Sequence, residues 1–447
     1  MFHSIDVMSG ATLYRREAQT WTQFAQALGD LQQRQQAFAQ TDIVERMAVL
    51  QAFGDRLAQN QEKLAEMVCA EVGRCLHECR AELAKSVELI RYYTRLAPEL
   101  LAHRTIATQA SLSQVRFEPL GVVLAVMPWN YPVWQVLRFA IPALCAGNAC
   151  VVKPAPSVAG VTAALFELVG EDLPLMCGWL ANEDVPAAIE ATDALAFTGS
   201  TETGRLLAAH AGRHLKKTVL ELGGSNPLIV LPDADLVQAA KEACYSRFRD
   251  AGQSCNAAKR IIVVESVAEQ FIPLFLAECA KLKSGHPADE STTLAPLHRS
   301  DLRQRVHEQV QDALVHGACC LIGGYLPEGV GWFYPATVLD GATPQCRVYH
   351  EEVFGPVAVL LRAENEAHAI ALANDTPFGL GASIYTADTR AAWAFAEQIQ
   401  TGAVFINRHT SSDLRLPFGG VKASGYGREL SEFGLYEFVN VKTYWQK

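Results

Sequence analysis

The 447-residue sequence contains no long apolar segment and no excess of positive charge. Its longest apolar run extends only from Leu120 to Trp129, whereas a membrane-spanning helix needs about twenty apolar residues. No basic segment followed by an apolar stretch begins the sequence, so we do not expect a secretory signal. The formal net charge of −10 argues against a nucleic acid or an anionic membrane surface as partner. We therefore expect a soluble, cytoplasmic protein.

The twelve cysteines form neither a CxxC pair nor the Cys/His spacing of a zinc site. Cys75, His77 and Cys79 come nearest, but they fall in a helical pattern, where alternate residues do not share a face. In so long a chain we interpret the cysteines as reduced thiols and not as a disulfide framework. The sequence predicts no metal site.

Two common glycine-rich nucleotide signatures are also missing. The chain has no GxGxxG, and the Walker pattern fails because no Lys-Ser/Thr pair follows Gly204. Instead, FTGSTETG (197–204) runs from an apolar segment into a helical one, and the free N–H groups of such a helix start favour a phosphate. Alone, this segment is equally well explained as an ordinary helix start.

The sequence is otherwise that of a folded protein of two or three domains, with 50% hydrophobic and 19% charged residues. Residues 19–105 carry helical periodicity, and Thr41-Asp42 is a plausible helix cap. Residues 111–119 alternate in the manner of an exposed strand.

From residue 120 onward, short apolar runs alternate with helical segments. The first series is LGVVLAVM (120–127), NACVVK (148–153), ALAFTG (194–199), KTVLELGG (217–224) and NPLIVL (226–231). The second series is KRIIVVE (259–265), PVAVLLR (356–362) and GAVFIN (402–407). Continuous apolar runs of this kind are typical of parallel strands that are buried on both faces. The pattern predicts two α/β units in tandem, with the helical N-terminal part packed on the first.

Four stretches place reactive side chains at the ends of expected strands. PWNYP (128–132) holds Asn130, VVKPAPS (151–157) holds Lys153, LELGGSNP (220–227) holds Glu221 and AGQSC (251–255) holds Cys255. Burial of Glu221 in an apolar strand would raise its pKa toward the range of a general base. The residues alone leave structural alternatives open: an inert thiol at Cys255, a turn-forming Asn130, and an ion pair of Glu221 with Lys216, Lys217 or Lys153.

Six motifs then occur in a fixed order: PWNYP, FTGSTETG, LELGGSNP, GQSC, HEEVFGPV (350–357) and PFGGVKASGYGREL (417–430). In these motifs the chain resembles the NAD(P)-dependent aldehyde dehydrogenase superfamily, from about residue 111 to the C-terminus. The ordered set is far more specific than any single motif. The resemblance implies an α/β, aldehyde dehydrogenase-like fold with two Rossmann-like α/β domains and a small β oligomerisation arm.

The resemblance also implies domain boundaries. We expect an NAD(P)-binding domain at 1–105 and 123–225, a catalytic domain at 226–425, and oligomerisation strands at 106–122 and 426–447. The alternating tail FVNVKTYW would pair with residues 111–119 and join subunits into a homodimer or a homotetramer.

By position, Cys255 matches the family's nucleophile, Glu221 its general base, and Asn130 its oxyanion donor together with the Cys255 backbone N–H. The thiolate would attack the aldehyde carbon while preorganised donors hold the oxyanion. Hydride transfer to the nicotinamide would leave a thioester, and Glu221 would activate the water that releases the acid. The presence of Glu221 argues for hydrolysis and against transfer to coenzyme A.

The expected cofactor is NADP or NAD. Lys153 resembles the contact to the adenosine ribose, and Gly199-Ser200 the contact to the pyrophosphate. The full set of implied cofactor residues is Pro128, Trp129, Lys153, Pro156, Ser157, Gly199, Ser200, Leu222, Glu352 and Phe354. Many strictly NAD-dependent members have a glutamate where this chain has Pro156, so NADP use is permitted.

Arg138, Trp134 and Ser412 are the predicted substrate contacts. An arginine and a hydroxyl near the mouth of the site would hold the far carboxylate of an ω-oxo acid. In these segments the chain resembles the shorter bacterial succinate-semialdehyde dehydrogenases, so we expect oxidation of succinate semialdehyde to succinate. The structural alternative has Arg138 extending to solvent and Arg415 paired with Asp413.

Other functions remain open at this point. A broad aliphatic or aromatic aldehyde dehydrogenase would use Trp129, Trp134 and Tyr131 as a hydrophobic tunnel. A nitrilase-like amidase needs no nucleotide, so cofactor binding separates it from a dehydrogenase. A binding protein without activity is separated by the thiol reactivity of Cys255.

Overall fold

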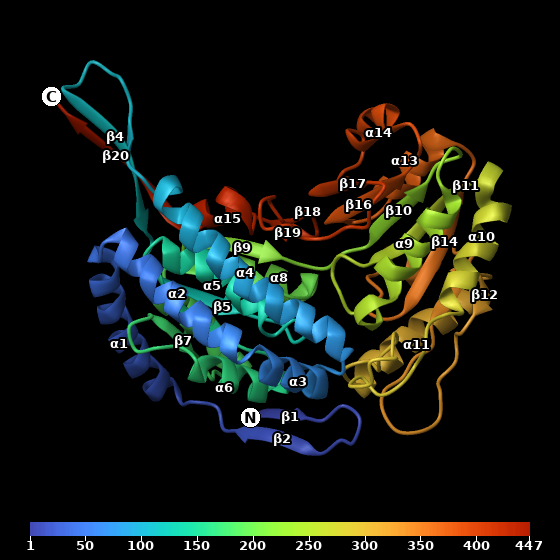
Figure 1. Ribbon diagram of the computed structural model, residues 1–447, viewed down its shortest axis with the longest axis horizontal. Helices are drawn as coiled ribbons and strands as arrows, with labels where there is room; N and C mark the ends of the chain where they lie inside the picture. Colours follow the sequence, from blue (N-terminus) through green and yellow to red (C-terminus); the bar gives the residue numbers. More distant parts are fainter.

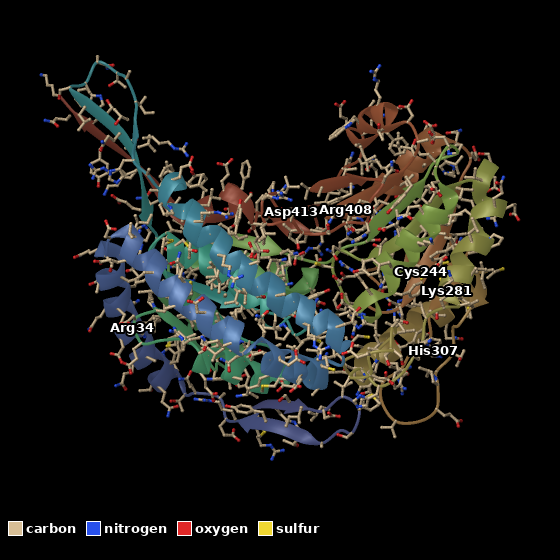
Figure 2. All side chains as sticks on the ribbon, viewed as in Figure 1. Arg34, Cys244, Lys281, His307, Arg408 and Asp413 are labelled. Atoms are coloured by element: carbon tan, nitrogen blue, oxygen red, sulfur yellow. The ribbon has the colours of Figure 1, made fainter.

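The computed structural model describes residues 1–447 and shows two α/β units side by side, with a thin β arm projecting from the first (Figure 1). The N-terminus forms a hairpin at the edge of the first unit, and the C-terminus lies at the tip of the arm (Figure 1). Figure 2 shows Arg34 on the first unit, Cys244, Lys281 and His307 on the second, and Asp413 where the two meet in this view. None of the helices combines the length and the apolar character that crossing a bilayer requires.

A hairpin and four helices precede the first sheet. They are β1 (Phe2–Ile5), β2 (Thr12–Arg16), α1 (Trp21–Gln40), α2 (Ile43–Gln59), α3 (Gln61–Val72) and α4 (Leu76–Leu100). Asp42 caps α2 by accepting a hydrogen bond from the N–H of Val44, as the sequence predicted for this position. The hairpin was not predicted; Phe2 is buried there against Trp179, a contact that residues 1–16 do not reveal.

The first sheet has six strands in the order β19-β9-β8-β5-β6-β7. Its strands are β5 (Val122–Val126), β6 (Ala149–Lys153), β7 (Leu175–Cys177), β8 (Ala194–Thr198), β9 (Lys217–Glu221) and β19 (Gly425–Tyr426). The helices between them are α5 (Trp134–Cys145), α6 (Ala159–Glu167), α7 (Val185–Ala191) and α8 (Thr201–Arg213). β5 to β9 are parallel, whereas β19 returns from the C-terminal region and pairs antiparallel with β9.

Both faces of this sheet are buried, which explains its continuous apolar strands. Val123 and Ala125 of β5 belong to the core formed with α2, α4 and α5. Val122 and Leu124 point to the opposite face and belong to the core that contains residues of α1.

The second sheet has seven strands in the order β12-β13-β14-β11-β10-β16-β17. They are β10 (Asn226–Val230), β11 (Ala258–Val264), β12 (Cys319–Ile322), β13 (Thr337–Asp340), β14 (Val357–Ala363), β16 (Gly381–Tyr385) and β17 (Ala403–Ile406). The helices of this unit are α9 (Leu236–Phe248), α10 (Glu265–Cys279), α11 (Ser300–Val315), α12 (Arg347–His350), α13 (Glu366–Asn374) and α14 (Thr389–Ala396). The sequence analysis placed NPLIVL (226–231) in the first strand series. This was wrong, because its strand β10 lies in the second sheet, between β11 and β16.

The arm is a three-stranded sheet of β3 (Arg104–Thr105), β4 (Leu112–Pro119) and β20 (Val439–Gln446), in the order β20-β4-β3. β20 pairs antiparallel with β4 along its whole length, from Val439 opposite Pro119 to Gln446 opposite Leu112. The short elements β15 (Phe378–Gly379), β18 (Val421–Lys422) and α15 (Ser431–Tyr436) complete the chain. The strand expected at 111–119 and its pairing with the tail are both present.

Candidate active site

Cys255 lies on a loop that follows a strained turn. The loop connects the short helical turn η3 (Arg249–Gly252) to β11, and φ is 52° at Asp250, 52° at Ala251 and 72° at Gly252. Left-handed backbone at a residue other than glycine costs about 1–3 kcal/mol and persists only where its surroundings enforce it. The loop is therefore held in one conformation by its neighbours.

Several hydrogen bonds enforce that conformation. The Asp250 carboxylate accepts hydrogen bonds from Arg74 Nε at 2.6 Å and from the Tyr131 hydroxyl, and the Asp250 N–H donates to the Glu78 carboxylate at 2.7 Å. Arg247 is buried and donates to the carbonyl oxygens of Gly252, Val353 and Gly355. Arg247 thereby ties the cysteine loop to the loop that carries Glu352 and Phe354.

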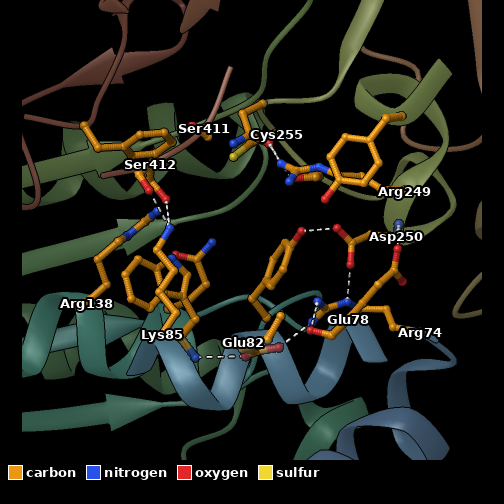
Figure 3. A pocket seen from close by; sticks show the side chains of 18 residues that line it. Arg74, Glu78, Glu82, Lys85, Arg138, Arg249, Asp250, Cys255, Ser411 and Ser412 are labelled. Carbon is orange, nitrogen blue, oxygen red and sulfur yellow. Dashed lines mark hydrogen bonds and ion pairs between the residues drawn. The ribbon is translucent and has the colours of Figure 1, made fainter. Parts of the chain in front are cut away.

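Cys255 lines two cavities. The first, called the α4 cavity, is shown in Figure 3 and is lined by Arg74, Glu78, Ala81, Glu82, Lys85, Tyr131, Trp134, Gln135, Arg138, Tyr245, Arg249, Asp250, Ser254, Cys255, Asn256, Ser411, Ser412 and Phe418. The second, called the β9 cavity, is lined by Pro128, Trp129, Asn130, Gln135, Thr198, Gly199, Ser200, Glu221, Leu222, Gly223, Cys255, Leu302, Arg305, Glu352 and Phe354. Cys255 therefore lies in the wall that the two cavities share.

Glu221 is the last residue of β9 and is 2% exposed. Its Oε2 lies 3.4 Å from Arg138 Nη2, and its Oε1 has no hydrogen-bond partner. Burial raises the pKa of Glu221 to about 7, although Arg138 acts in the opposite direction. The ion-pair alternative named Lys216, Lys217 or Lys153 as the partner; this was wrong, because Arg138 occupies that position.

Burial, followed by the charge of Glu221, raises the pKa of the Cys255 thiol well above its usual value. The Gly223-Gly224 pair after β9 brings the two residues together. A Cβ atom at Gly224 would clash with the backbone carbonyl of Cys255, so only glycine fits this close approach.

Asn130 follows β5 and is 5% exposed. The Asn130 Nδ2 donates to the backbone carbonyl of Gln253 at 3.0 Å, and the backbone carbonyl of Asn130 accepts a hydrogen bond from Arg74. The side-chain amide is thus fixed beside the cysteine loop, in the wall of the β9 cavity.

Seven of the ten predicted cofactor residues line the β9 cavity: Pro128, Trp129, Gly199, Ser200, Leu222, Glu352 and Phe354. Lys153, Pro156 and Ser157 lie outside its lining. Lys153 Nζ donates to Asn182 Oδ1 at 2.7 Å, and the Ser157 hydroxyl is hydrogen-bonded to His298 Nε2 at 2.8 Å. His298 in turn stacks on Trp129, so Ser157 reaches the cavity wall only through this ring.

The β9 cavity fits a dinucleotide. Ser200 is the N-cap of the 13-residue helix α8, and the free N–H groups of a helix start favour a phosphate. Trp129 and Phe354 meet edge to face with ring centroids 5.7 Å apart and give the cavity an aromatic wall. Glu352 accepts a hydrogen bond from the Gly224 N–H at 2.9 Å, so it is held beside the residues that follow β9.

The three predicted substrate residues, Arg138, Trp134 and Ser412, all line the α4 cavity. Arg138 is 2% exposed and pairs with Glu429 at 2.6 Å as well as with Glu221, so the alternative of a solvent-exposed Arg138 was wrong. The same alternative also predicted an ion pair between Arg415 and Asp413, and this pair is present at 2.7 Å. The guanidinium of Arg138 is therefore already balanced by two carboxylates.

Sequence reasoning missed the cations Lys85 and Arg249. Lys85 Nζ donates to the Ser412 carbonyl at 2.6 Å and to its hydroxyl at 2.5 Å, and lies 4.5 Å from the Trp134 ring. Arg249 Nη2 donates to Asn256 Oδ1 at 3.1 Å, while its Nε has no partner. A signal was present for Lys85, because Glu78, Glu82 and Lys85 have the spacing of one helix face.

The comparisons with known proteins agree with this geometry. The model of the aldehyde dehydrogenase family matches residues 1–444. The chain belongs to the aldehyde dehydrogenase family. It is 44% identical over 414 residues to the succinate semialdehyde dehydrogenase [NAD(P)+] Sad of Escherichia coli (strain K12), covering 91% of this chain and 89% of the relative. It is 41% identical over 452 residues to an aldehyde dehydrogenase of Paenarthrobacter nicotinovorans, covering 99% of both chains.

A solved structure extends the likeness to three dimensions. The succinic semialdehyde dehydrogenase of Streptococcus pyogenes, in complex with NADP+ as the cofactor, superposes with a TM-score of 0.96 at 33% identity, covering 100% of this chain and 99% of the other. This aldehyde dehydrogenase thus has the family fold over its full length and is an NAD(P)-dependent oxidoreductase. The family resemblance and the fold class predicted from the sequence are confirmed.

Proposed function

We propose that this aldehyde dehydrogenase oxidises succinate semialdehyde to succinate, and that Lys85, Arg249 and Ser412 hold the far carboxylate of the substrate. The observation that supports this proposal is that two cations of the α4 cavity, Lys85 and Arg249, form no ion pair. This assignment moves the main carboxylate contact from Arg138, which the sequence predicted, to Lys85 and Arg249.

The other two arginines of the α4 cavity both have acidic partners. Arg74 pairs with Glu82 and Asp250, and Arg138 pairs with Glu429 and Glu221. Lys85 and Arg249 form no ion pair. Glu78 does not balance them, because burial and the nearby Asp250 raise its pKa to about 8. A substrate carboxylate would supply the missing negative charge through charge-assisted hydrogen bonds.

The chemistry that we propose uses the residues around Cys255. The Cys255 thiol gives its proton to solvent, and the thiolate then attacks the aldehyde carbon, while the Asn130 amide together with the Cys255 N–H stabilises the oxyanion. The nicotinamide of NAD(P), when bound in the β9 cavity, supplies the hydride acceptor. Glu221 then takes a proton from the water that attacks the thioester, which releases succinate and returns Cys255 to the thiol. Arg138 acts as a positioning residue that holds the Glu221 carboxylate.

For the cofactor, we propose NADP or NAD in the β9 cavity, held by the seven predicted residues that line it. Lys153, Pro156 and Ser157, which lie outside this lining, would contact the adenosine part of the cofactor. Pro156 puts no carboxylate against a 2′-phosphate, which supports NADP use. The relative in Escherichia coli is named for NAD(P)+, and the Streptococcus pyogenes structure contains NADP+. In this proposal the first α/β unit binds the cofactor, with 1–105 and 123–225 as its boundaries, and residues 226–425 carry the nucleophile.

The decisive experiment compares succinate semialdehyde with butanal, which has the same chain length but no carboxylate. We expect wild type to prefer succinate semialdehyde in kcat/KM. Lys85→Met and Arg249→Met should each lower that preference by roughly tenfold to 100-fold, because a hydrogen bond to a charged group contributes about 1.5–3 kcal/mol. Activity with butanal should remain.

The matched control is Arg95→Met, which removes an exposed cation from the same helix α4 and should change neither substrate. If wild type prefers butanal, or if both variants lower the two activities equally, the proposed substrate is wrong. The broad-specificity alternative has less support, because Tyr131 and Trp134 line the α4 cavity whereas Trp129 lines the β9 cavity.

We further propose that the β arm joins subunits into a homodimer or homotetramer. β20 is an edge strand of its sheet, and a long unprotected edge strand is a common pairing surface. Val441 is 60% exposed and Trp445 is 52% exposed on this strand, so the arm presents apolar side chains that a second subunit would cover.

A further inference from the structure

A second cluster of ligand-type side chains lies outside both cavities, on the surface of the first α/β unit. His210 and His214 are four residues apart at the C-terminal end of α8, so their rings lie on one face of the helix, with centroids 5.0 Å apart. Glu190 reaches them from the neighbouring helix α7.

The three ligand atoms already have the spacing of a metal site. Glu190 Oε1 lies 3.1 Å from His210 Nε2 and 3.3 Å from His214 Nε2, and all three ligand atoms lie within 4.8 Å of one another. A tetrahedral zinc ion with bonds of about 2.0–2.1 Å holds its ligand atoms roughly 3.3 Å apart. Both Glu–His distances therefore match the edge of such a tetrahedron.

The cluster is also available to an ion. The side chains of His210, His214 and Glu190 are 22%, 39% and 49% exposed, which leaves the fourth coordination position open to water. The only side-chain partner of either imidazole is Glu190. The C-terminal end of a helix carries partial negative charge, which favours a cation at this position.

We propose that His210, His214 and Glu190 form a binding site for a divalent transition-metal ion that prefers imidazole ligands, such as Zn²⁺ or Ni²⁺. Because α8 rises about 1.5 Å per residue, the site lies far along the helix from Ser200, which lines the β9 cavity. The ion would tie α7 to α8 and would not take part in aldehyde oxidation.

Other candidate clusters lack one of these properties. Cys75, His77 and Glu78 also lie within ligand distance of one another. Both oxygens of Glu78, however, accept backbone N–H groups, one from Cys75 and one from Asp250. His316 and Asp312 form a pair on α11 without a third ligand, which makes His316 a suitable control.

The sequence predicted no metal because only the contact between α7 and α8 adds Glu190 to the histidine pair. The spacing of the sequence places only two histidines on one helix face, and two ligands are not enough to predict a metal site.

The test is a zinc titration of the full chain, with Cys255→Ser as the reference so that the catalytic thiol takes up no metal. We expect one equivalent of Zn²⁺ to bind the reference and to raise its melting temperature. That equivalent should be lost when His210→Gln and His214→Gln are combined. Its affinity should fall roughly tenfold or more in Glu190→Gln, which leaves both histidines in place.

His316→Gln serves as the control and should bind zinc like the reference. Untagged wild type should also be retained on a nickel column, and the double variant should not. With Cys255 present, the double variant should oxidise aldehyde at the wild-type rate, which shows that it is folded. If the double variant keeps the zinc equivalent, or if the reference binds none, the proposal is wrong.

Discussion

Glu221 and Lys85 carry displaced pKa values that predict the pH dependence of this enzyme. Burial raises the pKa of Glu221 to about 7, so the base becomes active as the pH rises through that value. Burial, reinforced by Arg138, lowers the pKa of Lys85 to about 8, so its positive charge is lost above that pH. With succinate semialdehyde, kcat should rise through about pH 7 and kcat/KM should fall above about pH 8.

Butanal separates the two limbs of this profile. It has no carboxylate for Lys85, so its kcat should rise with pH in the same way, whereas its kcat/KM should lack the alkaline decline. Lys85→Met should remove the same decline from the succinate semialdehyde profile. An alkaline decline of equal size with butanal would show that Lys85 does not hold the carboxylate.

Replacing Glu221 by Gln tests its role as the base for water. The first turnover should still reduce the cofactor, while hydrolysis of the thioester slows by roughly 10²–10⁴-fold. Rapid mixing should therefore show a burst of about one reduced cofactor per chain, followed by slow turnover. A first turnover as slow as the steady state would place Glu221 in an earlier step.

The candidate residues at strand ends were accessible from the sequence, whereas their ionic partners were not. Glu221 and Cys255 each lie within a short motif that can be read directly from the sequence. The Arg138 ion pair joins helix α5 to Glu429 near the C-terminus, and Arg249 stands out only because it forms no ion pair in the folded chain. Charge balance inside a cavity depends on tertiary contacts, and no local pattern contains that information.

The segment that links β9 to β10 requires glycine at position 224, where it passes close to the cysteine loop. In Gly224→Ala, the added Cβ would clash with the Cys255 carbonyl, and the cysteine loop would have to move. We expect a loss of kcat of roughly 100-fold or more, because small misplacements of reacting groups are costly. Far-UV circular dichroism should change little.

Gly29→Ala is the matched control for this variant. Gly29 lies inside α1, and a Cβ added there would meet nothing within 4 Å, so alanine should stabilise the helix by about 0.5–1 kcal/mol. Activity should be unchanged. If Gly224→Ala retains full activity, the close approach of the two loops is not required.

Helices and buried strands were predictable where their pattern is long, as in residues 19–105 and in the apolar runs from 120 onward. The short strands were not. β19 has two residues and joins the first sheet from the far end of the chain, and β1 with β2 depends on the contact between Phe2 and Trp179. Short elements of this kind are set by what they pack against.

The assembled protein should depend on the β arm. Trp445→Glu places a charge on the exposed side of β20, and we expect it to shift the oligomer toward smaller species in light scattering after size-exclusion chromatography. Leu13→Glu, at a 47% exposed position on β2, is the control and should leave the mass unchanged. A Trp445→Glu protein of wild-type mass would remove the arm from the subunit interface.

The position of Cys255 in the wall shared by the α4 and β9 cavities has a consequence for substrate binding and product release. In the proposed binding mode the aldehyde occupies the α4 cavity and the nucleotide the β9 cavity, so the two reactants reach the sulfur from different sides. In that binding mode, release of the acid would not require the nucleotide to leave first.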